Sequence, residues 1–215
     1  MHTNKSLVTP RSVLVIAALS LADLTPAHAQ DYPTRHGLWG GATLGYGSAS
    51  LSSDTLPGRH LNGFDVTLDV GWTLSSHARI GIEIDQWTSR LGAGRQTWLT
   101  NYLASLYYYP RTHRTFFVQA AAGISDYADV HLPWAFLGSS FADTVYYSGA
   151  AWGATAGVGW DIPLGAGSSL RPRVAFSYGW PRNLHSADGS VVATGWAQHW
   201  LSVDVGLVFH PGDSW

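Results

Sequence analysis

The segment from Trp200 to His210, WLSVDVGLVFH, has two faces of opposite chemistry. Successive side chains of an extended strand point to opposite sides, so Ser202, Asp204 and Gly206 share one face. The other face is entirely apolar and consists of Leu201, Val203, Val205, Leu207 and Phe209. This pattern is typical of a β-strand that crosses a bilayer, where lipid takes the place of a protein core.

The same alternation recurs in seven earlier segments, with turn-forming residues between them. We predict these strands at residues 38–47, 64–73, 79–85, 96–109, 115–125, 152–162 and 170–180. The fold class that follows is all-β: an eight-stranded antiparallel up-and-down transmembrane β-barrel in which the strands follow one another as a meander.

The connections predicted between these strands alternate in length. Three are short, at residues 75–77, 110–114 and 163–168, and we expect them in the periplasm. The other set, expected to face outside, covers residues 48–62, 91–95, 126–147 and 181–195. Loops of such scaffolds carry function, so an extracellular ligand is expected to bind through 48–62, 126–147 and 181–195.

The charge content supports a lipid-facing exterior. Only 12% of the residues are charged, whereas soluble domains carry roughly a quarter. A soluble lipocalin-like periplasmic carrier is the alternative with the same strand number. It would need an apolar interior and a charged outer face, which the low charge content disfavours.

The first 29 residues have the features of a cleaved secretory signal peptide. Lys5 and Arg11 precede an apolar run from Val13 to Ala22, and Ala27-His28-Ala29 is a small-x-small cleavage site. Residues 30–215 then form a single outer-membrane barrel domain with a short C-terminal tail at 210–215. The apolar run is too short for a spanning helix, which needs roughly 20 residues.

The mature chain has 13 acidic residues (14 minus Asp23) and 10 Arg (12 minus Lys5 and Arg11), a net charge of −3. This charge excludes a basic nucleic-acid footprint, so no nucleic-acid partner is expected. The sequence has no cysteine, which excludes disulfides and thiolate metal sites.

Nine charged residues fall on the inward face of the predicted strands. They are Asp65, Asp69, Arg79, Glu83, Asp85, Asp161, Arg171, Arg173 and Asp204. An eight-stranded barrel is only wide enough to be filled by side chains, so these groups must pair with one another. The sequence predicts a plug of ion pairs in the periplasmic half; a proton or ion path is the functional alternative.

The aromatic residues are expected to form two girdles at the membrane interfaces. The girdle residues singled out are Trp72, Trp160, Tyr108, Trp98, Trp152 and Trp180. Trp39, Trp87 and Trp196 are assigned to the girdle nearest the long loops. For Trp134 and Phe136, in the third long loop, a carbohydrate-binding platform is the alternative.

No catalytic, metal or cofactor site is predicted. His185, Ser186 and Asp188 supply a base, a nucleophile and an orienting acid in type, so a lipid A-modifying enzyme that uses the fourth loop is the alternative function. The other mature-chain histidines, including His210, are scattered without metal-ligand spacing, and an isolated surface position is expected for each.

Three stretches of the chain carry a family resemblance: Asn101–Pro110 (NYLASLYYYP), Gly157–Leu164 (GVGWDIPL) with Leu170–Val174 (LRPRV), and the closing VDVGLVF. They resemble the small eight-stranded outer-membrane β-barrel proteins, the group that includes the OmpA transmembrane domain, OmpX and the Opa adhesins. The resemblance implies that the final strand, with Leu201, Val203, Val205, Leu207 and Phe209, is the signal that the barrel assembly machinery recognises.

These observations predict a monomeric integral protein of the cell outer membrane with a structural or adhesive role through its outer loops. The expected partners are outer-membrane lipid, lipopolysaccharide and the barrel assembly machinery.

Overall fold

The computed structural model describes residues 37–92, 94–110, 115–131, 145–165, 167–180 and 183–211. These residues form eleven strands. They are β1 (Gly37–Ser52), β2 (Arg59–Ser75), β3 (Ala78–Gly92), β4 (Arg95–Tyr108), β5 (Phe116–His131), β6 (Val145–Trp160), β7 (Ile162–Gly165), β8 (Ser168–Gly179), β9 (Asn183–Ser186), β10 (Val191–Thr194) and β11 (Ala197–Phe209).

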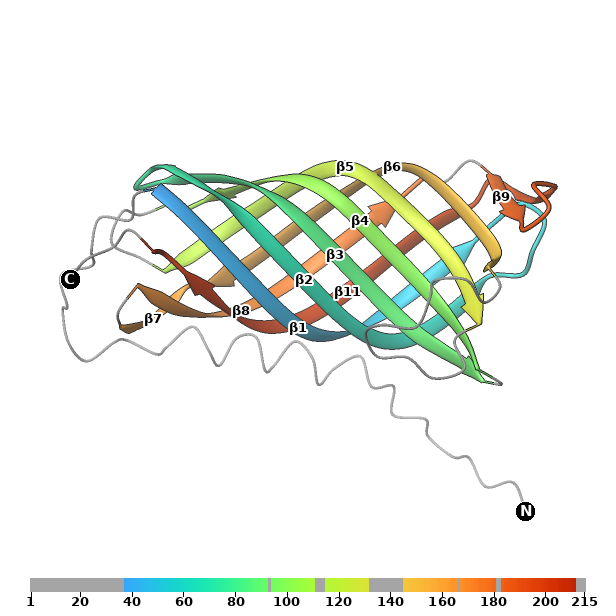
Figure 1. Ribbon diagram of the computed structural model, residues 1–215, viewed down its shortest axis with the longest axis horizontal. Helices are drawn as coiled ribbons and strands as arrows, with labels where there is room; N and C mark the ends of the chain where they lie inside the picture. The colour runs from blue at the N-terminus through green and yellow to red at the C-terminus, as the bar shows by residue number, and fades with distance from the viewer. Residues whose placement is uncertain are drawn as a thin grey trace, which may run out of the picture. The chain divides into compact units, whose positions relative to one another are not determined.

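Eight of these strands close into one antiparallel barrel, which confirms the predicted fold class. The pairing runs from β1 to β6 in order, then from β6 to β8, from β8 to β11, and from β11 back to β1. The closing pair extends from Gly40 opposite Phe209 to Ser52 opposite Ala197. Figure 1 shows the strands running obliquely around the barrel, with β7 at one end and β9 at the other.

The two ends of the barrel differ in their connections. The β2–β3 turn, the end of β4 with the start of β5, and the end of β6 with the start of β8 lie at one end, called here the short-turn end. The other end, called here the long-loop end, carries the β1–β2 connection and the hairpin of β9 and β10.

Two of the predicted long connections are shorter than expected. Residues 91–95 do turn the chain as predicted, but as a tight turn and not a long connection, because β3 and β4 pair as far as Gly92 opposite Arg95. Gly94 has a φ of 78°, which suits the tight turn. The predicted 48–62 loop is reduced to residues 53–58, since β1 and β2 stay paired up to Leu51 opposite Arg59.

The other two predicted loops also contain regular structure. Strand β5 reaches His131 and β6 starts at Val145, so only 132–144 of the predicted 126–147 loop lies outside the described residues. Within 181–195, β9 and β10 form a hairpin in which Val191 pairs with His185 and Thr194 with Asn183. The polar residues of these two segments correctly indicate a connection between strands. They do not show how far the strands continue beyond the membrane.

The outer wall carries an apolar band. On β2, Phe64, Val66, Leu68, Val70, Trp72 and Leu74 are all exposed. These residues span ten residue steps, about 33 Å along the strand at about 3.3 Å per residue. With a strand tilt of about 40°, the band is about 25 Å tall, the height of the lipid-facing band of membrane barrels. No helix in the described part of the chain is long and apolar enough to cross a membrane.

The outward and inward side chains of the barrel strands differ sharply in exposure, which settles which side meets lipid. On β11, Val203, Val205 and Leu207 are 48%, 52% and 41% exposed. The inward Asp65, Glu83 and Arg173 are 1%, 0% and 2% exposed. An apolar exterior around buried charges is the inverse of a soluble carrier, so the lipocalin-like alternative does not fit this part of the barrel.

The polarity reverses where the strands continue past the band toward the long-loop end. The outer face there carries polar residues: Ser48, Ser50, His60, Asn62, Thr88, Arg90, Gln96 and His199. The inner face is mainly apolar, with Leu51, Leu99 and Trp200 fully buried. This section, called here the stalk, is therefore built like a water-soluble barrel, with its apolar core inside.

The bilayer position of the apolar band can be tested with one arginine. We expect Val205→Arg, at the middle of the exposed row of β11, to lower the free energy of unfolding by about 2–4 kcal/mol, the cost of Arg at the midplane. Asn62→Arg, on the polar outer face of the stalk, is the matched control and should change it by less than about 0.5 kcal/mol. Denaturant unfolding in lipid bilayers measures both, and equal costs would contradict the band.

Candidate functional site

The interior of the barrel is filled in three layers. A lower aromatic cluster at the short-turn end consists of Trp39, Tyr107, Tyr109, Phe117 and Val208. An upper apolar cluster at the long-loop end consists of Ala49, Leu51, Trp87, Leu99, Tyr127, Leu184, Ala193, Trp196 and Trp200. The charged side chains lie between these clusters and interleave with the lower one.

Arg171 organises the charges nearest the short-turn end. Its Nε donates to Asp161 Oδ1 at 2.7 Å and its Nη1 to Asp69 Oδ2 at 2.6 Å. Arg79 donates to the second oxygen of Asp161 at 3.0 Å. The guanidinium carbon of Arg171 also lies 4.9 Å from the ring centroid of Tyr107, a cation–π distance. The contact between Arg171 and Asp69 thereby joins β8 to β2 across the lumen.

The local backbone explains how Asp161 reaches the interior. Strand β6 ends at Trp160 and β7 starts at Ile162, and the Asp161 N–H between them donates to the carbonyl of Thr115 at 2.9 Å. The β6–β8 pairing stops at Arg173 and the β7–β8 pairing starts at Leu170, so Pro172 lies in the gap. Proline has no N–H to donate, which suits this interruption.

Arg173 organises the charges at the centre. It donates to Asp204 at 2.9 Å, to Thr67 Oγ1 at 2.6 Å and to Gln119 at 3.2 Å, and it forms an ion pair with Glu83 at 3.4 Å. Because Arg offers five N–H donors in a planar fork, one side chain connects β2, β3, β5, β8 and β11.

Tyr107 links the two arginine centres. Its hydroxyl lies 3.0 Å from Asp69 Oδ2 and 2.9 Å from Glu83 Oε2. Asp69 and Glu83 pair directly across β2 and β3, so two carboxylates face each other beside this hydroxyl. Gln119 donates to Glu83 at 2.5 Å. Each of these two carboxylates therefore has at least one neutral donor as well as an arginine.

Asp65 is the least compensated of the interior charges. Both of its carboxylate oxygens are buried and have no hydrogen-bond partner among the described side chains. Asp85, which accepts from Thr67 at 3.1 Å and Ser177 at 3.2 Å, and Asp204 act on Asp65 as like charges. Arg173 is the cation that opposes them, and a buried carboxylate without an ion pair of its own costs stability.

The structure thus brings together all nine predicted interior residues, each at most 7% exposed. Eight of them form a connected set of hydrogen bonds and ion pairs, and Asp65 adjoins the set through its like-charged neighbours. The sequence analysis missed Tyr107, Tyr109, Gln119 and Thr67. Their position on the inward phase of β2, β4 and β5 was the available signal.

The six girdle residues all lie outside the lumen. Trp72 and Tyr108 are exposed near the short-turn end, and Trp152 and Trp180 near the other end of the band. Trp160 is half-buried and packs on Phe116 with ring centroids 5.4 Å apart. Half-buried Trp98 lies on the outer face of the stalk, four residues beyond Tyr102.

Three other tryptophans are not where the sequence analysis expected them. Trp39, Trp87 and Trp196 are buried inside the barrel, not in a girdle. Trp39 also lies at the short-turn end, because β1 starts there opposite the end of β2. Trp39 and Trp87 have the inward phase of β1 and β3, and Trp196 directly precedes β11, so their large apolar rings fill the lumen at both ends.

The last strand presents a continuous apolar row to the outside. Leu201, Val203, Val205, Leu207 and Phe209 are all exposed, and Phe209 pairs with Gly40 on one side and Ser168 on the other. His210 is a correction: a surface position was expected, but its side chain is buried. Its backbone N–H donates to the carbonyl of Gly167 at 2.7 Å.

The fourth-loop residues do not form a nucleophile and base. Ser186 Oγ donates to Asp188, while His185 Nδ1 lies 3.3 Å from the carbonyl of Gly189. The hydrogen bond from Ser186 lowers the pKa of Asp188 to about 2, so this carboxyl is ionised and caps the Asp188-Gly189 turn through the N–H of Ser190 at 2.9 Å. The geometry is that of a hairpin turn.

Within the described ranges, no group of three or more His, Asp or Glu side chains is arranged to hold a metal ion. Trp134 and Phe136, the candidate carbohydrate platform, lie outside the described residues.

A closed eight-stranded barrel with an apolar outer wall and paired charges inside is a transmembrane β-barrel. The family model described as "Outer membrane protein beta-barrel domain" matches residues 13–209, and the chain belongs to this family. This confirms the family expected from the sequence, and membership implies the outer membrane as its location.

Two solved structures share the fold. Neisserial surface protein A is 15% identical, with a TM-score of 0.52, and the match covers 81% of this chain and 97% of that one. Ail, the attachment invasion locus protein of Yersinia pestis, is 10% identical with a TM-score of 0.54, covering 81% and 99%. No curated protein sequence matches the chain significantly.

The unequal roles of Arg173 and Asp65 can be tested with two variants. Arg173→Leu leaves Asp204 and Glu83 without their cation, and we expect it to lower the free energy of unfolding by about 3–5 kcal/mol. Asp65→Asn keeps the shape but removes a like charge, so its stability should equal or exceed that of the wild type. Unfolding followed by Trp fluorescence measures both, and a strongly destabilised Asp65→Asn would contradict the charge argument.

The three filled layers predict a closed lumen. The purified protein should show no steady, large conductance in planar bilayers. A Trp87→Ala, Trp200→Ala double variant should stay closed too, because the ionic layer and the lower aromatic cluster remain in place. A large steady current through the wild-type protein would show that the layers do not fill the barrel.

Proposed function

We propose that this protein is a non-enzymatic outer-membrane barrel with a structural and adhesive role, carried by the surface at its long-loop end. The observation that carries the proposal is the filled interior, in which charges and aromatic rings occupy the lumen from one end to the other. Because the lumen is filled, the outer wall and the exposed end are the surfaces to which partners can bind.

The long-loop end supports a binding role because it is rigidly built. Leu184 of β9 and Ala193 of β10 are buried in the upper apolar cluster, which anchors the hairpin to the stalk. The β1–β2 connection joins the hairpin through the N–H of Asp54 and the carbonyl of Thr194 at 3.1 Å. A recognition surface held in this way loses little conformational entropy on binding.

The proposal extends to the ends of the chain and to its partners. Residues 1–29 act as a cleaved signal peptide, and 30–215 form the exported barrel domain. The exposed row of β11 is the segment for the barrel assembly machinery to recognise. Lipopolysaccharide and other outer-membrane lipids surround a monomer, and the long-loop end faces the cell exterior.

The adhesive role can be tested on the hairpin. Val191 is exposed on β10, and Val191→Ser removes an apolar contact without touching the buried anchors. Bacteria that display this variant should bind host cells or matrix about fivefold less, as expected when one interface contact of about 1 kcal/mol is lost. Ser76→Ala, at the exposed turn of the opposite end, is the matched control and should bind like the wild type.

Two outcomes would contradict this proposal. Equal binding by the wild type, Val191→Ser and a deletion strain would remove the adhesive role. A change in lipid A mass on deletion that Ser186→Ala reproduces would establish the enzymatic alternative. We expect the lipid A mass to be the same in all strains, since Ser186 Oγ bonds to Asp188 and not to His185.

A further inference from the structure

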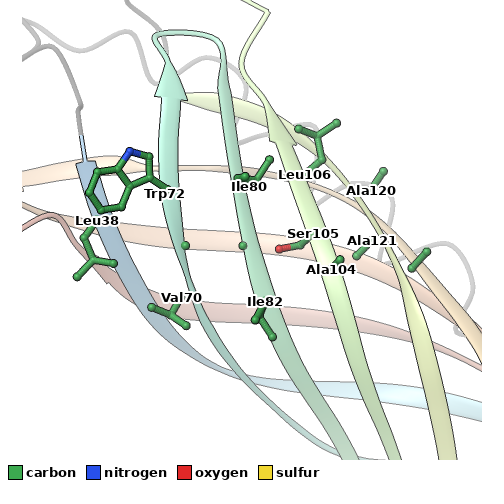
Figure 2. A pocket seen from close by; sticks show the side chains of 13 residues that line it. Leu38, Val70, Trp72, Ile80, Ile82, Ala104, Ser105, Leu106, Ala120 and Ala121 are labelled. Carbon is green, nitrogen blue, oxygen red and sulfur yellow. The ribbon is translucent and has the colours of Figure 1, made fainter.

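The apolar band of the outer wall contains a hollow. A groove of about 760 Å³ crosses β1 to β5 near the short-turn end. Its floor is formed by Ala104, Ala120 and Ala122, whose short side chains leave space above the strands. Larger side chains border it, among them Ile80, Ile82 and Leu106 (Figure 2).

Strand register places these alanines side by side. Ala104 pairs with Ala122 across β4 and β5, and Leu106 pairs with Ala120 in the next outward row. Ile82 pairs with Ala104 on the other side. Short side chains beside longer ones therefore leave a hollow of about 760 Å³ along the wall.

The groove changes chemistry at one end. Trp72 stands at the end nearest the β2–β3 turn, with its indole exposed (Figure 2). The turn beyond it contains the exposed hydroxyls of Ser75 and Ser76 and the half-buried imidazole of His77, whose Nδ1 lies 3.2 Å from Ser76 Oγ. Groups that can form hydrogen bonds therefore lie at the membrane interface, next to the end of the apolar groove.

We propose that this groove is a phospholipid site of the leaflet at the short-turn end. One acyl chain lies over Ala104, Ala120 and Ala122, and the headgroup phosphate accepts hydrogen bonds from the Trp72 indole N–H and the β2–β3 turn. The choice of a phospholipid rests on the proposed orientation, in which the long-loop end faces the cell exterior, but not on the adhesive role.

Its position and shape favour a lipid over a second copy of this chain. The groove lies in the band that faces the bilayer, so acyl chains are the molecules that surround it. A two-fold dimer fills the groove only if the same patch carries side chains placed to enter it, because each contact is repeated across the axis. A flexible acyl chain fills such a hollow. The groove retains the lipid through close packing, because bulk lipid is as apolar as the groove.

Native mass spectrometry of the full-length protein tests the site. The protein is released into mild detergent from bilayers of phosphatidylethanolamine, and the lipid bound per barrel is counted. Ala120→Leu and Ala122→Leu fill the groove, and we expect each to reduce the retained lipid about fivefold. Trp72→Phe keeps the ring but loses the N–H donor, and a similar reduction is expected from one lost hydrogen bond.

Ala42→Leu is the matched control, because Ala42 is exposed in the same band but lies outside the groove. It should retain lipid like the wild type. Circular dichroism and resistance to unfolding in detergent verify that each variant is folded, and Trp72→Phe provides a conservative test if a leucine variant does not fold. Equal retention by all folded variants would overturn the proposal, and so would a dimer in place of the lipid-bound monomer.

Discussion

Closure of β1 on β11 is the constraint on which the structure depends. The hydrocarbon core of a bilayer offers no hydrogen bonds, so every backbone N–H and C=O of a spanning strand must find a partner within the protein. The pairing of Gly40 with Phe209 through to Ser52 with Ala197 removes the last open edges. A closed barrel in turn has a fixed, narrow interior, and everything inside must fit and pair within it.

Charge pairing is the second consequence of this closure. Arg171 and Arg173 are adjacent inward residues on β8, and each reaches carboxylates on strands across the lumen. Their guanidinium forks bridge strands that share no backbone pairing, such as β8 and β2. Because six carboxyl groups face three arginines, hydroxyl and amide donors such as Tyr107 and Gln119 are needed to satisfy the remainder.

Strand alternation made much of this architecture predictable. A period of two assigns each side chain to a face, and the short β2–β3 turn then sets the register that places Asp69 opposite Glu83. The stalk was not predictable in this way. Ser48 and Asn62 have turn-forming composition, yet they are the polar outer face of paired strands. The burial of Trp39 and Trp87 was also missed, because tryptophan suits an interface and a filled lumen equally well.

The change of polarity along the strands is set by packing at one level of the barrel. Gly47 pairs with Gly63, and the Trp87 indole lies against them, with its Nε1 donating to the Gly47 carbonyl at 3.4 Å. A Cβ on Gly63 would come within 2.8 Å of the Trp87 ring. Gly63 therefore makes room for the Trp87 ring, which lies where the ionic centre meets the upper apolar cluster of the stalk. Below this level lipid covers the wall and charges fill the lumen; above it, water covers the wall and the hydrophobic effect holds the strands together.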